Sequence, residues 1–135
     1  MTPGPAAVRS QPLRGEIWAF DLNPTRGREQ RGIRPCLVVS ADALNRSRFG
    51  TVIICPITTT ERPTFRWRPG LRPEDLRTAD VDWAPHPHWV ATDQIVTVDT
   101  AWRALRHLAT VVNREKVRAV ESSLRLLLDL GTPGH

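Results

Sequence analysis

An arginine-rich segment, residues 26–35, runs directly into the apolar sequence 36–40. The segment holds four arginines, one carboxylate, one amide and two glycines, and the apolar residues after it have the composition of a buried strand. Arginine suits phosphate best, because its planar guanidinium donates a fork of hydrogen bonds and stays charged at any working pH. Polar groups on a loop at the end of a rigid strand are a common way to build a site. The simpler interpretation is a solvated basic loop before a core strand.

Motifs on both sides of the segment favour a functional site. RGEIW-x-x-DL-x-P precedes it at residues 14–24, and within it stands G-x-EQ-x-G-x-RP, which continues into LVVS. An N-R pair at 45–46, a strand ending in P-I-T at 56–58 and DQI-x-T-x-D at 93–99 follow. In order and spacing these motifs resemble the MazF/PemK/Kid family of toxin endoribonucleases. The resemblance covers residues 14–130, nearly the whole chain.

The resemblance implies two catalytic residues, Arg34 and Thr58. RNA cleavage without a metal uses the neighbouring 2′-OH as nucleophile, so the site must accept a proton, return one and stabilise negative charge on the phosphate. Arg34 fits the role of charge stabiliser, because a pKa above about 12 makes arginine a poor general base. Thr58 offers a hydroxyl donor to the same phosphate. Without Arg34 beside it, Thr58 would be interpreted as an ordinary β-branched residue at a strand end.

Glu29 is the one carboxylate of the arginine-rich segment. It is therefore the ordinary candidate for accepting the 2′-OH proton. Reading a base edge and holding an arginine in place are two further roles that suit the same side chain. The sequence leaves these three roles open.

Other polar residues of the motifs are predicted to contact RNA. Amides suit the hydrogen bonding of exposed bases, which is how single-stranded RNA is recognised, and the candidates are Gln30, Asn45 and Gln94. The arginines expected to contact the RNA backbone are Arg28, Arg31 and Arg46. Trp67 or Trp89 is suited to stacking on bases, although core packing is the simpler role for each.

No metal or cofactor is predicted. The carboxylates are scattered along the chain without the spacing of a ligand set. His86 and His88 are two residues apart in a proline-rich stretch, but no third or fourth zinc ligand accompanies them. We therefore expect both to be surface histidines. Cys36 and Cys55 lie in apolar runs and are interpreted as buried, reduced thiols.

The basic charge is concentrated in the half of the chain that holds the arginine-rich segment. Residues 1–68 carry 11 Lys+Arg and 5 Asp+Glu, or +6, and residues 69–135 carry 8 and 9, or −1, which together give the net +5. This asymmetry suits a protein with a polyanion-binding face. All of the basic residues except Lys116 are arginine. A biased genomic base composition also produces such a preference for arginine over lysine.

Several apolar runs are predicted to form the strands that position these side chains. The expected strands are residues 17–22, 34–40, 51–57, 64–69, 89–99 and 108–112. A single helical turn capped by Ser40 is expected at 40–46 and a short helix at 101–106, whereas 69–87 is expected to be loop.

A C-terminal helix is expected over residues 114–130. Asn113 is a suitable N-cap, Gly131 a suitable stop, and one face is apolar: Val117, Val120, Leu124, Leu127 and Leu128. Strands followed by a closing helix indicate an α+β fold with a small, strongly bent antiparallel sheet. The resemblance implies the same, an SH3-like barrel of the MazF/CcdB type.

The chain is predicted to be one domain, residues 14–130, between a disordered tail at 1–13 and a short tail at 131–135. Neither a membrane span nor a signal peptide is predicted, so a cytoplasmic location is expected.

The main hypothesis is the toxin of a type II toxin–antitoxin pair, a metal-independent, sequence-specific endoribonuclease of single-stranded RNA. The resemblance further implies a homodimer, and the basic groove suggests an acidic, MazE-like antitoxin as partner. Two alternatives stay open. One is a CcdB-like toxin that inhibits gyrase by binding, and the other is a non-catalytic RNA-binding barrel.

Overall fold

Three adjacent antiparallel strands form the centre of the fold, in a computed structural model that describes residues 11–24, 27–28 and 32–131. They are β1 (Glu16–Asp21), β2 (Ile33–Val38) and β3 (Thr51–Thr58). The strands predicted at 17–22, 34–40 and 51–57 are thus confirmed to within one or two residues at each end.

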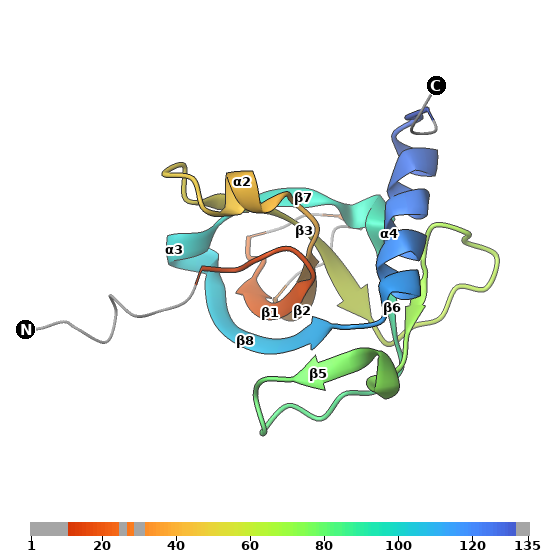
Figure 1. The fold of residues 1–135 in the computed structure, drawn as a ribbon, viewed down its shortest axis with the longest axis horizontal. Coiled ribbons are helices and arrows are strands. Elements are labelled where there is room, and N and C mark those ends of the chain that lie inside the picture. Colours follow the sequence, from red (N-terminus) through yellow and green to blue (C-terminus); the bar gives the residue numbers. More distant parts are fainter. Residues whose placement is uncertain (1–10, 25–26, 29–31, 132–135) are drawn as a thin grey trace, which may run out of the picture.

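The remaining strands extend this centre on both sides. They are β4 (Gly70–Leu71), β5 (Leu76–Thr78), β6 (His88–Val90), β7 (Val96–Asp99) and β8 (Ala104–Val111). The sheet has the order β4-β6-β3-β2-β1-β8-β5, and β7 also pairs with β3. The strongly bent sheet encloses a nearly closed barrel (Figure 1).

Short helices and one long helix connect and cover the strands. They are α2 (Asp42–Asn45), η1 (Pro73–Asp75), η2 (Thr92–Gln94), α3 (Thr100–Arg103) and α4 (Arg114–Leu127). In Figure 1, α4 stands along one side of the barrel, whereas α2 and α3 lie on the opposite side. One long helix therefore covers one side of the barrel, and two short helices cover the opposite side.

Two apolar clusters lie on the two faces of β1, β2 and β3, because alternate residues of a strand point to opposite faces. The inner cluster is Trp18, Phe20, Leu22, Cys36, Val38, Val52, Ile54, Val98 and Ala104. The outer cluster is Ile17, Ala19, Leu37, Cys55, Ile57, Leu71, Val90, Leu108, Val111 and Val120. With both faces covered, the central strands form a rigid support.

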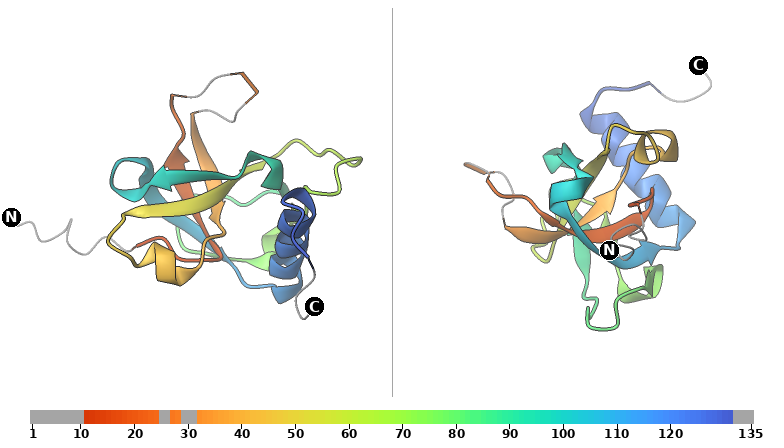
Figure 2. Two further views of the ribbon diagram at one scale, coloured as in Figure 1. Left: turned by 90° about the horizontal axis from the view of Figure 1, so that it is seen from above. Right: turned by 90° about the vertical axis from the view of Figure 1, so that its left-hand side faces the viewer.

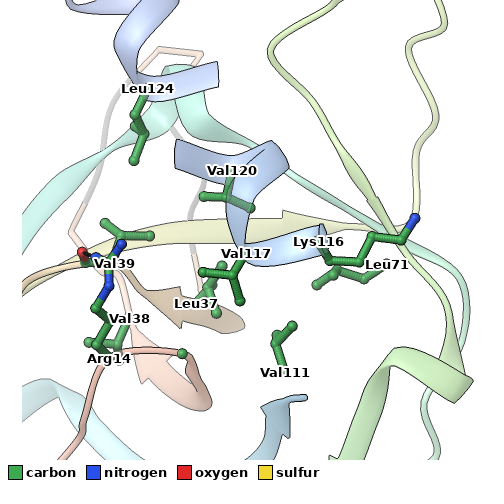
Figure 3. Close-up of a pocket in the computed structure, with 11 residues that line it drawn as sticks. Arg14, Leu37, Val38, Val39, Leu71, Val111, Lys116, Val117, Val120 and Leu124 are labelled. Atoms are coloured by element: carbon green, nitrogen blue, oxygen red, sulfur yellow. Dashed lines mark hydrogen bonds between the residues drawn. The ribbon is translucent and has the colours of Figure 1, made fainter. Parts of the chain in front are cut away.

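Helix α4 covers the outer cluster. Asn113 caps it by accepting a hydrogen bond from the Glu115 N–H at 3.0 Å, as predicted. Val117, Val120 and Leu124 face the sheet across a narrow cavity of about 30 Å³ (Figure 3). The cavity is lined mainly by apolar side chains, so we interpret it as a gap in the packing of α4.

Three predictions about the middle of the chain are wrong. Residues 64–69 form turns instead of a strand, and the supposed loop 69–87 contains β4, η1 and β5. The strand expected at 89–99 is divided into β6 and β7 by η2, because β3 pairs with β6 at one end and with β7 at the other.

The end of the chain also differs in detail from the prediction. The short helix ends at Arg103, and the following strand β8 begins at Ala104 instead of residue 108 because it pairs along most of β1. Helix α4 ends at Leu127, and the predicted core residue Leu128 is half exposed. The helical turn α2 is confirmed but its N-cap is Ala41 instead of Ser40.

Leu13 was predicted to be the last residue of the N-terminal tail, directly before the domain. Its N–H donates to Glu16 Oε1 at 2.9 Å, so the ordered chain includes this residue. Within the described residues, none of the helices combines the length and apolar character that crossing a membrane requires.

Candidate functional site

The register of β2 and β3, extended by two residues, aligns Arg34 with Thr58. Cys36 pairs with Pro56, and both strands continue two residues further in the same direction. Directly opposed residues of an antiparallel pair project from the same face, and that face is the one on which Cys36 and Ile54 join the inner cluster. Arg34 and Thr58 therefore lie together at the mouth of the barrel, just beyond its apolar interior.

The surroundings of Arg34 combine apolar support with partial burial. Arg34 pairs with Phe20 on β1, and Phe20 is completely buried. Arg34 itself is half-buried. A guanidinium held between a packed strand and solvent has fewer accessible conformations, and its charge is screened less than on an open surface. This placement suits the stabilisation of charge on a bound anion.

Thr58 presents a hydroxyl that is nearly buried. Its side chain Oγ1 accepts a hydrogen bond from the Thr60 N–H at 3.1 Å, and the residue is 7% exposed. Among the described residues no acceptor for the hydroxyl hydrogen is recorded. The hydroxyl can thus donate to a ligand oxygen at the mouth without losing an internal hydrogen bond.

Arg103, a residue the sequence analysis missed, fixes the base of the arginine-rich segment. Its Nη1 donates to the carbonyl of Asp21 at 2.8 Å and also to that of Asn23. Across the same base, Asn23 Oδ1 accepts from the Gly32 N–H at 3.1 Å. The segment therefore leaves the barrel from a braced stem. No sequence signal links Arg103 to carbonyls about eighty positions away.

The structure describes only part of the predicted RNA-contacting loop. Arg28 is exposed, as a backbone-contacting arginine requires. Glu29, Gln30 and Arg31 lie outside the described residues.

Asn45 is not placed for reading bases. The residue is completely buried, and its Nδ2 donates to the Ser40 carbonyl and to Asp42 Oδ1, both at 2.9 Å. Its Oδ1 accepts from the Ser40 hydroxyl. An amide with its hydrogen bonds used internally has none left for a base, so the prediction for Asn45 is corrected to a structural role in α2.

Arg46 is exposed, but it follows α2 at the end of the barrel remote from Arg34 and Thr58. The length of β3, roughly 23 Å at about 3.3 Å per residue, separates the two regions. In the left view of Figure 2, β1 and β2 extend upward toward the arginine-rich segment, and α2 lies on the lower side. The structure therefore does not bring Arg46 into the group around Arg34.

Gln94 lies in η2, which crosses beside the end of β3. The neighbouring Asp93 accepts two hydrogen bonds from Arg68, each 2.9 Å long. Burial alone would raise the pKa of Asp93, but the hydrogen bonds and charge of Arg68 hold it below its ordinary value. This bidentate pair ties residues 59–69, which carry the stacked rings of Phe65 and Trp67, to η2. The aspartate of the DQI motif thus has a structural role here.

No group of side chains in the described part of the chain is arranged to hold a metal ion. Burial raises the pKa of both thiols, to about 12 for Cys55, and the nearby Cys55 raises that of Cys36 further. Both cysteines are therefore protonated and unreactive at neutral pH.

The prediction that His88 lies on the surface is wrong. It is 6% exposed, stacks on Trp83 and has its Nδ1 2.6 Å from the His86 carbonyl oxygen. Burial lowers its pKa below the ordinary value, against the opposing effect of that hydrogen bond. His88 packs beside the outer cluster as a neutral ring.

His88 should make the protein less stable as the pH falls below about 6.5, the ordinary histidine pKa. Because the pKa in the folded state is depressed, the unfolded chain binds more protons between the two pKa values, and the free energy of unfolding rises with pH in that window. Urea unfolding at pH 7.5 and 5.5 measures the change. His88→Gln should weaken this pH dependence, and His86→Gln, which removes only the smaller effect of the neighbouring charge, should weaken it much less. An equal loss of stability in all three proteins would contradict the assignment.

Comparisons with known proteins identify a family and individual proteins that are similar to this chain. Residues 13–128 match the family described as the PemK-like, MazF-like toxin of type II toxin-antitoxin system. Endoribonuclease MazF9 of Mycobacterium tuberculosis is 44% identical over 121 residues, which cover 87% of this chain and 96% of that protein. Endoribonuclease PemK of Escherichia coli is 45% identical over 51 residues, and the matched part spans 38% of each of the two chains.

A solved structure supports the architecture. A mycobacterial endoribonuclease in complex with its cognate antitoxin superposes with a TM-score of 0.69 and 27% identity, over 90% of this chain and 99% of that one. The predicted fold class, a small bent antiparallel barrel with a C-terminal helix, is confirmed.

Proposed function

This chain belongs to the PemK-like, MazF-like toxins of type II toxin–antitoxin systems, and on that premise we propose that it cleaves single-stranded RNA without a metal ion. The family predicted from the motifs is thereby confirmed, and the matched relatives are endoribonucleases. The observation that carries the proposal is the alignment of Arg34 with Thr58 at the mouth of the barrel. The cytoplasm, where RNA is abundant, is the expected location.

The proposed reaction is an in-line transfer at phosphorus. The 2′-oxygen next to the scissile phosphate forms a new bond to phosphorus while the bond from phosphorus to the 5′-oxygen breaks. The proton of the 2′-OH passes to a base, and a second proton reaches the departing 5′-oxygen. The products are a 2′,3′-cyclic phosphate and a 5′-OH end.

Arg34 would neutralise the charge that builds up on the phosphate oxygens, which is the largest electrostatic demand of this reaction. Its side chain is half-buried and rests on a strand packed on both faces. Thr58 would donate its hydroxyl hydrogen to one of the same oxygens. Glu29, as the one carboxylate of the arginine-rich segment, remains a candidate base, a base-reading residue or a support for an arginine.

The RNA contacts proposed beyond this pair follow the motifs. Arg28 and Arg31 would contact the backbone, while Gln30 and Gln94 would hydrogen-bond bases. Arg28 and Gln94 are solvent-accessible in the structure, which supports these roles. Arg46 would contact only a bound RNA strand that extends along the barrel.

One assay separates this function from its alternatives. The pure protein is incubated with a long RNA in excess EDTA, and the fragments are separated by size. Cleavage at a small set of sites is expected. RNA that is bound but intact would indicate a non-catalytic RNA-binding barrel, and RNA neither bound nor cut would favour a protein-binding toxin.

The proposed protein partner is an acidic antitoxin segment. A structural relative of this chain was solved with its cognate antitoxin, and the N-terminal half here has a net charge of +6, from 11 Lys+Arg and 5 Asp+Glu. A segment rich in carboxylates would occupy the phosphate positions and so block RNA. Because such binding displaces counterions, RNA affinity should fall steeply as salt is added.

We expect the protein to act as a two-fold dimer. One small barrel presents a short polar mouth, and reading several nucleotides needs a longer groove, which two arginine-rich segments would build together. Analytical ultracentrifugation measures the assembly, and Arg34→Ala should leave it unchanged. A monomer at concentrations that give full specific activity would rule out the shared groove.

A further inference from the structure

We propose that Trp89 is a stacking platform for one nucleobase of the bound RNA, beside Arg34 and Thr58. The inference rests on the proposed function, since the ligand is the same RNA. It assigns to that site a base-binding position supplied by β6.

Strand pairing places Trp89 in line with the two site residues. Thr58 pairs with Trp89, and Trp89 pairs with Gly70 on the edge strand β4. Since opposed residues project from the same face, Arg34, Thr58 and Trp89 form one row across β2, β3 and β6. Neighbouring strands lie about 4.8 Å apart, so Trp89 is roughly one strand spacing from Thr58. A base attached to the nucleotide at Thr58 is within reach of the indole.

The indole of Trp89 is not used by the core. Trp89 is half-buried and belongs to neither apolar cluster, although the next residue, Val90, is completely buried in the outer one. Trp18, by contrast, lies in the inner cluster and donates its indole N–H to Glu16. In the part of the chain that the structure describes, no hydrogen bond is recorded for the indole N–H of Trp89. A ligand can therefore use both its ring and its donor.

The indole of Trp89 lies over Gly70, which has no side chain to obstruct it. A Cβ at this position would stand 3.2 Å from Trp89 Nε1, closer than most side chains pack, and 3.5 Å from Cδ1, an ordinary contact distance. Beyond the ring, at the edge of the sheet, is a hollow of about 520 Å³, within the range typical of small-molecule sites. The hollow is lined by Trp89 and Gly70 and by charged side chains of both signs: Glu61, Arg72, Glu74 and Lys116.

These features fit a base better than a phosphate. An aromatic face stacks on any base, and the mixed charges around the hollow offer both donors and acceptors to a base edge. Arg34 and Thr58 would hold the phosphate, while Trp89 would fix the base and thereby the position of the scissile bond.

The test combines variants with an RNA that has one mapped cleavage site. Trp89→Ala should lower kcat/KM about 10- to 100-fold, the effect typical of losing one stacked base, whereas Trp89→Phe should stay within a few-fold of wild type. Trp102→Ala is the matched control, because Trp102 is 84% exposed on α3 at the other end of β3. Thermal unfolding of each variant verifies that it is folded.

A series of RNAs, each lacking one base, identifies the stacking position. One abasic site should impair wild type strongly yet add nothing to the Trp89→Ala defect. Normal cleavage by Trp89→Ala, or penalties that add for every abasic site, would overturn the proposal. If wild type cuts no RNA, the proposed nuclease fails instead, and the same variants are then compared by binding of labelled single-stranded RNA. Equal binding by wild type and Trp89→Ala would overturn the stacking role too.

Discussion

Replacing Arg34 with alanine should lower kcat by about 10²–10³ or more, as the loss of one oxyanion donor does in other enzymes. The reason is that Arg34 stands at the barrel mouth with Thr58, where phosphate charge would develop. Affinity for RNA should fall much less, because the arginines of the exposed segment still contact phosphates. Single-turnover cleavage and filter binding measure the two effects separately.

Two companion variants make this result specific. Arg34→Lys should restore activity only partly, because lysine keeps the charge but lacks the bidentate fork. Thr58→Val, which removes the hydroxyl and keeps the shape, should have a smaller effect than Arg34→Ala. Near-normal turnover by Arg34→Ala would remove this residue from the mechanism.

Replacing Asn45 with alanine should lower the free energy of unfolding by about 2–4 kcal/mol. The change deletes two donated hydrogen bonds and one accepted bond at a completely buried position and leaves the Ser40 carbonyl without that partner. Urea unfolding measures the loss.

The adjacent residue is the matched control for this prediction. Arg46→Ala, on an exposed side chain, should change the free energy of unfolding by less than about 0.5 kcal/mol. At temperatures where both variants are folded, cleavage by Asn45→Ala should be close to wild type. A stable Asn45→Ala protein with altered cleavage-site preference would return Asn45 to the base-reading group.

The central strands were predictable because their apolar runs are continuous and end at clear turn residues. Residues 64–69 misled the prediction because the alternation of Phe65 and Trp67 arises from a stacked pair in a turn, with ring centroids 5.2 Å apart, and not from a sheet. Most of β8 was missed because Arg106 and His107 interrupt its apolar pattern and its pairing with β1 includes register shifts. Such irregularities depend on partners distant in sequence.

In the candidate site too, features set by the local sequence were predicted, and features set by contacts with distant residues were not. Arg34 and Thr58 were found because the motifs carry them, and their alignment follows from pairing between adjacent strands. Asn45 was misassigned because a motif shows that an amide is present but not that it is buried. Arg103 was missed, and the choice between Trp67 and Trp89 for stacking on bases stayed open, because both depend on tertiary contacts. Arg103 contacts backbone carbonyls, and Trp89 pairs with β3 and β4.

The chemical nature of the cleaved ends tests the account most directly. A defined single-stranded RNA is cut by the wild-type protein in excess EDTA, and the products are analysed by mass spectrometry and by end-labelling. We predict 5′ fragments that end in a 2′,3′-cyclic phosphate and 3′ fragments that begin with a 5′-OH, with both absent for Arg34→Ala at equal times. Products with a 5′-phosphate, or cleavage that stops when Mg²⁺ is removed, would indicate a metal-activated water and contradict the mechanism.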